Sequence, residues 1–162
     1  MIQIRNKRLP LPVIQGGMGV GVSLGGLAGA VAACGGMGCV SAAHAGYREA
    51  DFRQNPQEAD LRGLKQEIDR ARHLSNGRGL VAVNLMVAMK QYAPLVRAAV
   101  EAGADAINCS QSGPATFYNT VPSFYVPNGA FVELADGIRR VVKIPVATVG
   151  RINSPQLAEE II

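Results

Sequence analysis

The most chemically suggestive stretch of this sequence is a glycine-rich run without charge. Residues 12–43 carry no formal charge, and Gly16, Gly17 and Met18 directly follow a short β-like run at 12–15. Without Cβ atoms, the two glycines can adopt positive φ and let the backbone approach a flat ligand closely. Exposed backbone N–H groups there suit an electron-rich ring or a phosphate. The pattern therefore predicts a ligand-contacting loop at 16–18.

Polar residues also follow the other apolar runs, at Ser41–His44, Asn84, Ser110–Gly113 and Gly150-Arg151. If these runs are parallel strands, their carboxyl ends are where ligands bind. We therefore expect these residues to form one site together with 16–18. Within it, His44 is a candidate acid or base, although an ordinary loop histidine is the plainer explanation. For Asn84, a buried amide bonded to the backbone is the plainer alternative.

The elements that must position these residues alternate along the chain. After a lead-in at 1–11, we predict strands at 12–15, 37–40, 79–86, 104–109 and 145–149. We predict helices at 24–34, 56–75, 92–102, 131–141 and 156–162. The strands are almost wholly apolar, which is typical of a parallel sheet covered by helices on its outer face. This order predicts an α/β fold of the parallel (β/α) barrel type. The long loop at 110–129 favours a functional or a disordered segment.

Two plainer interpretations of residues 12–43 compete with a ligand loop. The first is a transmembrane helix, because the span is long and its glycines have GxxxG spacing. Glycine pairs at 16–17 and 35–36 interrupt it, and large aliphatic residues are few. The second is close packing of a helix on a sheet, which suits Gly25, Gly26 and Gly29.

Composition limits the classes of function. The chain has 162 residues, 48% of them apolar and 17% charged, which favours one globular domain over residues 1–162. Its net charge of +4 comes from scattered basic residues with few aromatics among them, so we expect no nucleic-acid partner. The three cysteines lie in apolar runs and predict buried thiols in a reducing compartment, without a metal site. With no leader sequence recognised, the cytoplasm is the expected location.

Four segments resemble one known family. Residues 12–18 (PVIQGGM), 35–43 (GGMGCVSAA), 83–85 (VNL) and 99–105 (AVEAGAD) resemble the nitronate monooxygenases, formerly 2-nitropropane dioxygenases. The flavin-dependent enoyl-ACP reductases share this pattern, which covers about residues 1–107. The resemblance implies a (β/α)8 barrel that binds FMN at its carboxyl-terminal face. It also implies that Gly16, Gly17 and Met18 lie beside the isoalloxazine ring, and that Asn84 bonds the flavin or its phosphate arm.

The C-terminal part resembles a different family. Residues 129–162 are similar to the old yellow enzyme and 2,4-dienoyl-CoA reductase family, in which a strand ending in Gly-Arg holds the FMN phosphate. Here this implies Gly150 and Arg151, whose planar guanidinium suits several oxygens. A surface arginine is the plainer alternative. The chain thus reads as a chimera with a junction near 104–129.

These resemblances imply an FMN-dependent oxidoreductase that oxidises small nitronates, with enoate or enoyl-thioester reduction as the alternative. A third hypothesis is an inactive partial-barrel scaffold that binds FMN, phosphate or nothing. The family's catalytic histidine segment is absent, which leaves His44 as the candidate for catalysis. A complete barrel takes about 250 residues, so five or six βα units predict an open sheet. Because open edges invite pairing, we expect a homo-oligomer formed through them.

Overall fold

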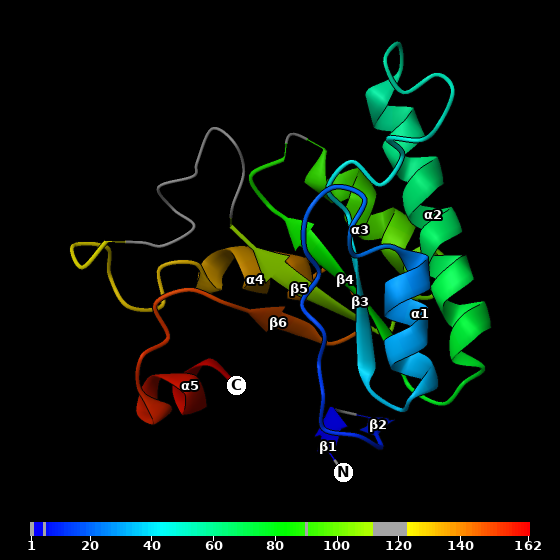
Figure 1. The fold of residues 1–162 in the computed structure, drawn as a ribbon. Helices are drawn as coiled ribbons and strands as arrows, with labels where there is room; N and C mark the ends of the chain where they lie inside the picture. The colour runs from blue at the N-terminus through cyan, green and yellow to red at the C-terminus, as the bar shows by residue number, and fades with distance from the viewer. Residues whose placement is uncertain (1, 5, 90, 112–122) are drawn as a thin grey trace.

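The computed structural model describes residues 2–4, 6–89, 91–111 and 123–162. A sheet of four parallel strands lies at its centre (Figure 1). The strands stand side by side in chain order: β3 (Met37–Ser41), β4 (Leu80–Met86), β5 (Ala106–Ser110) and β6 (Val146–Thr148). An isolated parallel bridge joins Ile14 to Met37, so the 12–15 segment lies beside β3 as an incomplete fifth strand.

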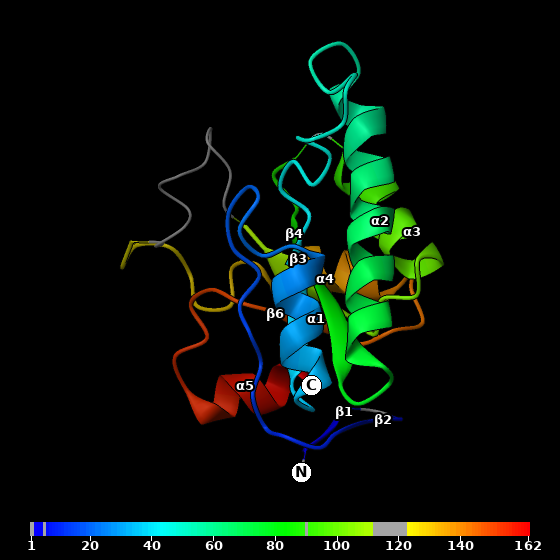
Figure 2. The same cartoon turned by 45° about the vertical axis from the view of Figure 1, so that its right-hand side comes forward.

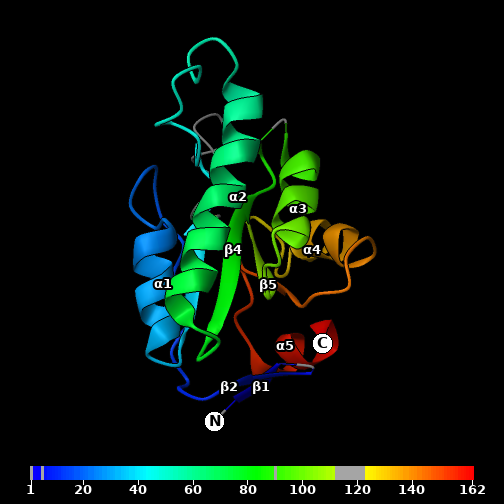
Figure 3. The same cartoon turned by 90° about the vertical axis from the view of Figure 1, so that its right-hand side faces the viewer.

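The helices of the sheet gather on one of its faces, as Figure 3 shows. They are α1 (Gly25–Ala33), α2 (Pro56–Ser75), α3 (Tyr92–Glu101) and α4 (Val132–Arg139). Right-handed crossovers between strands that follow one another in space as in sequence place every helix on the same side. A doubly wound sheet would instead reverse its strand order and cover both faces. The predicted α/β class, with a parallel sheet of partial-barrel type, is confirmed.

The best predicted helix is α2, whose ends carry clear local signals. Pro56 occupies the first turn, where its missing N–H is not needed, and Asn76 ends the helix in the left-handed conformation at φ 47°. Its buried face is spaced for a helix: Leu64, Ile68 and Ala71 belong to the core beneath it, while Ala59 and Gly63 contact the turn at 45–46. This face anchors the outer core, in which Val40, Val83, Leu85 and Ile107 are fully buried strand residues.

Glycines in α1 and β3 serve close packing. A Cβ at Gly29 would lie 2.7 Å from the Cβ of Leu74 in α2, and a Cβ at Gly38 would overlap the backbone of Ala28. Gly25 likewise meets the backbone of Glu67. Gly25 and Gly29 therefore serve close packing against helix α2 rather than the predicted packing on the sheet, whereas Gly26 meets only the Arg70 side chain, at 3.6 Å. The helix they occupy has nine residues. No helix in the described ranges has the length and apolarity needed to cross a membrane.

The other face of the sheet is covered only at its amino end. An antiparallel hairpin of β1 (Ile2–Ile4) and β2 (Lys7–Leu9) lies below the strands (Figure 2). Leu9 is fully buried there with Met37, Cys39 and Leu80, and Lys7 Nζ lies 2.7 Å from Asp105 Oδ1. Among the described residues, no helix lies over the carboxyl half of this inner face. Of the residues that follow the strands, His44 is exposed, whereas Ala42, Ala43 and Gln111 are buried.

Two predictions about local structure need correction. The strand expected at 12–15 is reduced to a single bridge with β3, because Pro12 has no N–H to donate to the ladder. Cys34 is exposed rather than buried, because it caps α1 at its solvent-facing end, whereas Cys39 and Cys109 are buried as expected. The long-loop prediction at 110–129 falls largely on residues 112–122, which lie outside the described residues.

Candidate functional site at the carboxyl edge of the sheet

A row of one hydroxyl and two amide side chains, called the amide row below, crosses the inner face of the sheet. Ser41, Asn84 and Asn108 stand opposite one another in β3, β4 and β5. Asn108 Nδ2 donates to Asn84 Oδ1 at 2.8 Å, and Asn84 Nδ2 donates to the carbonyl oxygen of Gly17 at 2.7 Å. The structure therefore brings Gly17 and Asn84 together. The contact is made directly between the two residues.

The loop that carries Gly16–Met18 is fastened by buried polar groups. Gln15 Oε1 accepts from the Cys39 N–H at 2.9 Å, and Gln15 Nε2 donates to Ser23 Oγ at 3.1 Å. Ser23 Oγ in turn accepts from the Met18 N–H at 2.9 Å. A Cβ at Gly17 would lie 2.5 Å from that of Asn84, so only glycine lets the loop reach the amide row. The loop is consequently pre-formed, and its shape depends on Gly17.

These bonds decide which of the predicted contacts are free for FMN. The Asn84 amide and the Gly17 carbonyl bond each other, and the Met18 N–H bonds Ser23. One N–H of the Asn84 amide and the Gly17 carbonyl oxygen are therefore used within the protein. The Gly16 carbonyl oxygen accepts from Gln15 Nε2 and Ser23 Oγ, while the residue itself is exposed and has open space where a Cβ would stand.

Gly150 and Arg151 follow β6, the end strand of the sheet, which lies beside β5. Both have positive φ, 113° and 57°, and a Cβ at Gly150 would meet the ring of Phe131. Arg151 Nη2 donates to the carbonyl oxygen of Phe124 at 3.2 Å, and its guanidinium stands 5.9 Å from that ring centroid. Its buried Nε has no hydrogen-bond partner among the described residues. The observed contacts of Arg151 are thus with the segment at 124–131, rather than with 16–18.

His44 is held by a carboxylate that the sequence analysis missed. His44 Nδ1 lies 3.2 Å from Asp60 Oδ2; the Asp60 side chain is 0% exposed, whereas that of His44 is 51% exposed. Asp60 Oδ1 also accepts from the Gly46 N–H at 3.1 Å, and Oδ2 accepts from Gln91 Nε2 at 3.0 Å. The two atoms are within hydrogen-bond distance, and Nδ1 is the donor in the tautomer in which the carboxylate accepts. This pairing is the arrangement of an oriented base.

Local structure brings this pair together. His44 has a left-handed backbone at φ 45°, which is uncommon for a residue with a side chain and marks local strain. A Cβ at Gly63 of α2 would lie 2.5 Å from Gly46 Cα, so two glycines allow the 44–46 turn to approach the helix. The sequence does carry a signal for Asp60: it stands four residues before Leu64, an acidic residue on an otherwise apolar buried face.

The two buried thiols are poor nucleophiles. Burial raises the pKa of Cys39 to about 12, while a backbone hydrogen bond with Gly17 acts in the opposite direction. Burial also raises the pKa of Cys109 to about 11. Because the thiolate is the reactive form, both remain protonated at neutral pH. Within the described ranges, no group of three or more His, Cys, Asp or Glu side chains could hold a metal ion.

We expect these thiols to make the fold sensitive to alkali. The folded pKa values lie above the ordinary value of 9.0, so folding is favoured below pH 9 and loses stability as the pH rises through that value. Each thiol then removes up to about 1.4 kcal/mol per pH unit. Urea unfolding at pH 8, 9 and 10 measures this loss. The Cys39→Ala/Cys109→Ala variant should lose less over the same interval, and an equal loss would contradict the assignment.

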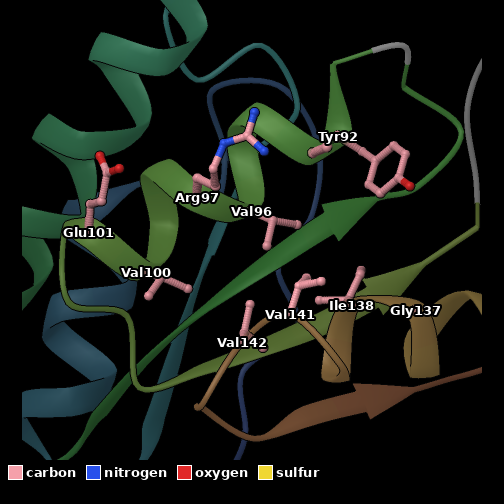
Figure 4. A pocket seen from close by; sticks show the side chains of 10 residues that line it. Tyr92, Val96, Arg97, Val100, Glu101, Gly137, Ile138, Val141 and Val142 are labelled. Atoms are coloured by element: carbon pink, nitrogen blue, oxygen red, sulfur yellow. The ribbon is translucent and has the colours of Figure 1, made fainter.

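A hollow lies on the opposite, helical face. It has a volume of about 480 Å³ and separates α3 from α4. Figure 4 shows apolar side chains along it, including Val96, Val100, Ile138 and Val142. It offers few polar groups that converge on one point, so it is less suited to chemistry than the carboxyl edge.

Comparison with known proteins identifies no family. No family model matches the chain, and no curated protein matches it. A crystal structure of dihydrodipicolinate synthase from Bacillus clausii is similar over 62% of this chain, at 23% identity and a TM-score of 0.43. The match covers 31% of that enzyme's chain.

The predicted membership of the nitronate monooxygenases over 1–107, and of the old yellow enzyme family over 129–162, is therefore wrong. No family model matches the chain over either stretch, and no curated protein of either family matches it. The packing gives a physical reason for the misleading motifs. Gly17 and Gly38 are required by close contacts inside this fold, so short glycine-rich and apolar motifs can recur wherever a strand packs this closely on a helix.

Proposed function

We propose that this protein is an enzyme of small-molecule chemistry in which His44 acts as a general acid–base. The observation that carries the proposal is the contact between the exposed His44 imidazole and the fully buried Asp60 carboxylate. General bases need a defined tautomer and access to substrate. Asp60 supports the first requirement, and the half-exposed ring supports the second.

The surroundings of His44 favour catalysis over a purely structural role. A histidine that only fastened a turn would gain from an unstrained backbone and from burial of its ring. His44 instead has positive φ and stays half exposed, while Phe52 contacts its ring edge-to-face at 5.5 Å. Gln91 and Gly46 satisfy the remaining carboxylate positions. The reaction class that follows is proton transfer to or from a small molecule at the carboxyl edge.

Deuterium exchange tests this proposal across a panel of small molecules. Small carbonyl compounds with acidic C–H bonds are incubated with the protein in D2O, and loss of the proton signal is followed by NMR. We expect one class of compound to exchange, and His44→Gln to slow that exchange by about 10²–10⁴-fold. His73→Gln, which changes the chain's other, exposed histidine, is the matched control. Exchange that survives in His44→Gln would overturn the proposal.

FMN binding, with oxidoreductase chemistry, is a second candidate. It is favoured by the open space at Gly16 and by the buried Arg151 Nε, which has no partner among the described residues. When bound, FMN would supply electron transfer, and Arg151 would hold its phosphate. A protein with neither proton-transfer activity nor bound FMN would instead be the inactive partial-barrel scaffold.

A visible absorption spectrum distinguishes these candidates. If FMN is bound, the protein purifies with flavin absorption or acquires it on reconstitution, and released FMN is identified by chromatography. Arg151→Gln should then weaken binding by about tenfold or more, because a charged hydrogen-bond donor is lost. Arg140→Gln, on the exposed end of α4, is the matched control. A colourless protein after reconstitution would exclude FMN.

A further inference from the structure

Both ends of the parallel sheet have an unpaired side. Among the described residues, β6 pairs with β5 alone, and the 12–15 segment pairs only through Ile14 and Met37. The two outer segments run in the same direction, because every pairing across the sheet is parallel. Free backbone N–H and C=O groups at such edges are satisfied best by another strand. The natural occupant of each edge is therefore a polypeptide strand.

The surface at the first edge is apolar and uncharged. Six large side chains between 11 and 22 are between 44% and 67% exposed: Leu11, Val13, Ile14, Met18, Val20 and Val22. No charged residue occurs from 9 to 43, so no charge in this strip opposes contact with a second copy of the chain. Contiguous apolar patches of this kind mark interaction surfaces in soluble proteins.

The surface at the second edge is also incomplete. A hollow of about 530 Å³ lies beside β6, and apolar residues of β1, β6 and α5 (Pro155–Ile161) line much of it, among them Ile4, Val146, Ala147 and Ile161. The last helix, α5, has no buried residue. A parallel sheet is normally covered on both faces. The inner face next to β6 thus lacks the neighbour that would cover it.

We propose that two copies of this chain join head to tail, with the 12–15 segment of each copy pairing in parallel with β6 of the other. A two-fold rotation brings both pairs of edges together at once and closes the ring. Each copy supplies the strand that the other lacks, and strand direction is the same on both sides of each junction. The apolar strip at 11–22 then covers the open face beside β6.

The strand register is compatible with this closure. Ile14 stands level with Met37, whereas Ala147 stands level with Asn108, Asn84 and Ser41, four residues further along β3. Pairing Ile14 with Ala147 of the other copy therefore shifts the register by four residues at each junction. Two such junctions give a total shift of about eight residues around a ring of ten segments, five from each copy.

A charge swap at the two edges tests the proposal by sedimentation equilibrium. Ile14 and Ala147 are both exposed, so Ile14→Lys and Ala147→Glu should keep the native circular dichroism and thermal midpoint. We expect the wild-type chain to be a dimer and each variant alone to be a monomer. An equal mixture of the two variants should recover the dimer, because one junction is then unaltered and the other pairs Lys with Glu.

Three outcomes would overturn the head-to-tail dimer. A monomeric wild-type chain would show that the edges stay free. A dimeric Ile14→Lys variant beside a monomeric Ala147→Glu variant would show β6 pairing with its own copy around the two-fold instead. A mixture that stays monomeric would show that the two edges do not meet. Leu134→Lys, on the exposed side of α4, is the matched control and should remain dimeric.

Discussion

Replacing Asp60 by Asn is expected to remove about 10²–10⁴-fold of the deuterium-exchange activity proposed for His44. The substitution keeps the volume of a fully buried side chain but turns an acceptor-only group into one that also donates. His44 Nδ1 can then accept from the new amide, which places the imidazole proton on Nε2. Nε2 would lose the lone pair that it needs as a base, as in the wrong-tautomer effect described for catalytic triads.

Nitrogen NMR of the two histidines separates this tautomer change from a loss of folding. In the wild-type chain we expect His44 to carry its proton on Nδ1, and in Asp60→Asn on Nε2, while His73 stays unchanged. Gln91→Ala is the matched control, because it removes a neutral donor to the same carboxylate and leaves Nδ1 bonded. Full activity in Asp60→Asn, with the tautomer shifted, would show that His44 is not the base.

Replacing Gly38 by Ala is expected to lower the free energy of unfolding by about 3 kcal/mol. The new Cβ would overlap the backbone carbonyl of Ala28, which cannot move aside as a flexible side chain could. Helix α1 would therefore have to withdraw from β3, opening the tightest contact on the helical face. Urea unfolding at neutral pH measures the loss as a shift of the midpoint.

The matched control is Gly137→Ala in α4. Gly137 is exposed and has nothing within 4 Å of its Cβ position, so alanine should stabilise the helix by about 0.5–1 kcal/mol. Opposite signs for the two substitutions would confirm that Gly38 is required by packing. Equal effects would show that α1 can shift at little cost, and that the glycines of 12–43 have another purpose.

Local signals in the sequence determined most of the fold. The limits of α2 follow from Pro56 at its start and left-handed Asn76 at its end, and the apolar run before Asn84 predicts a buried parallel strand. These features depend on residues that are close in sequence, where backbone sterics and hydrophobic period act directly. The strand at 12–15 is reduced to one bridge with β3, because Pro12 has no N–H to donate and the segment lies at an edge that sequence alone does not identify.

The candidate site depended on contacts between distant residues. Sequence placed Gly17 and Asn84 at strand ends but left open whether they face a ligand or each other, and the hydrogen bond between them decides this. His44 and Asp60 are joined because Gly46 and Gly63 let a turn approach a helix. The sequence by itself determined the order of strands and helices and the edge at which polar residues collect. Only the tertiary structure decided which polar groups are satisfied internally and which are left for chemistry, because that depends on distances across the packed fold.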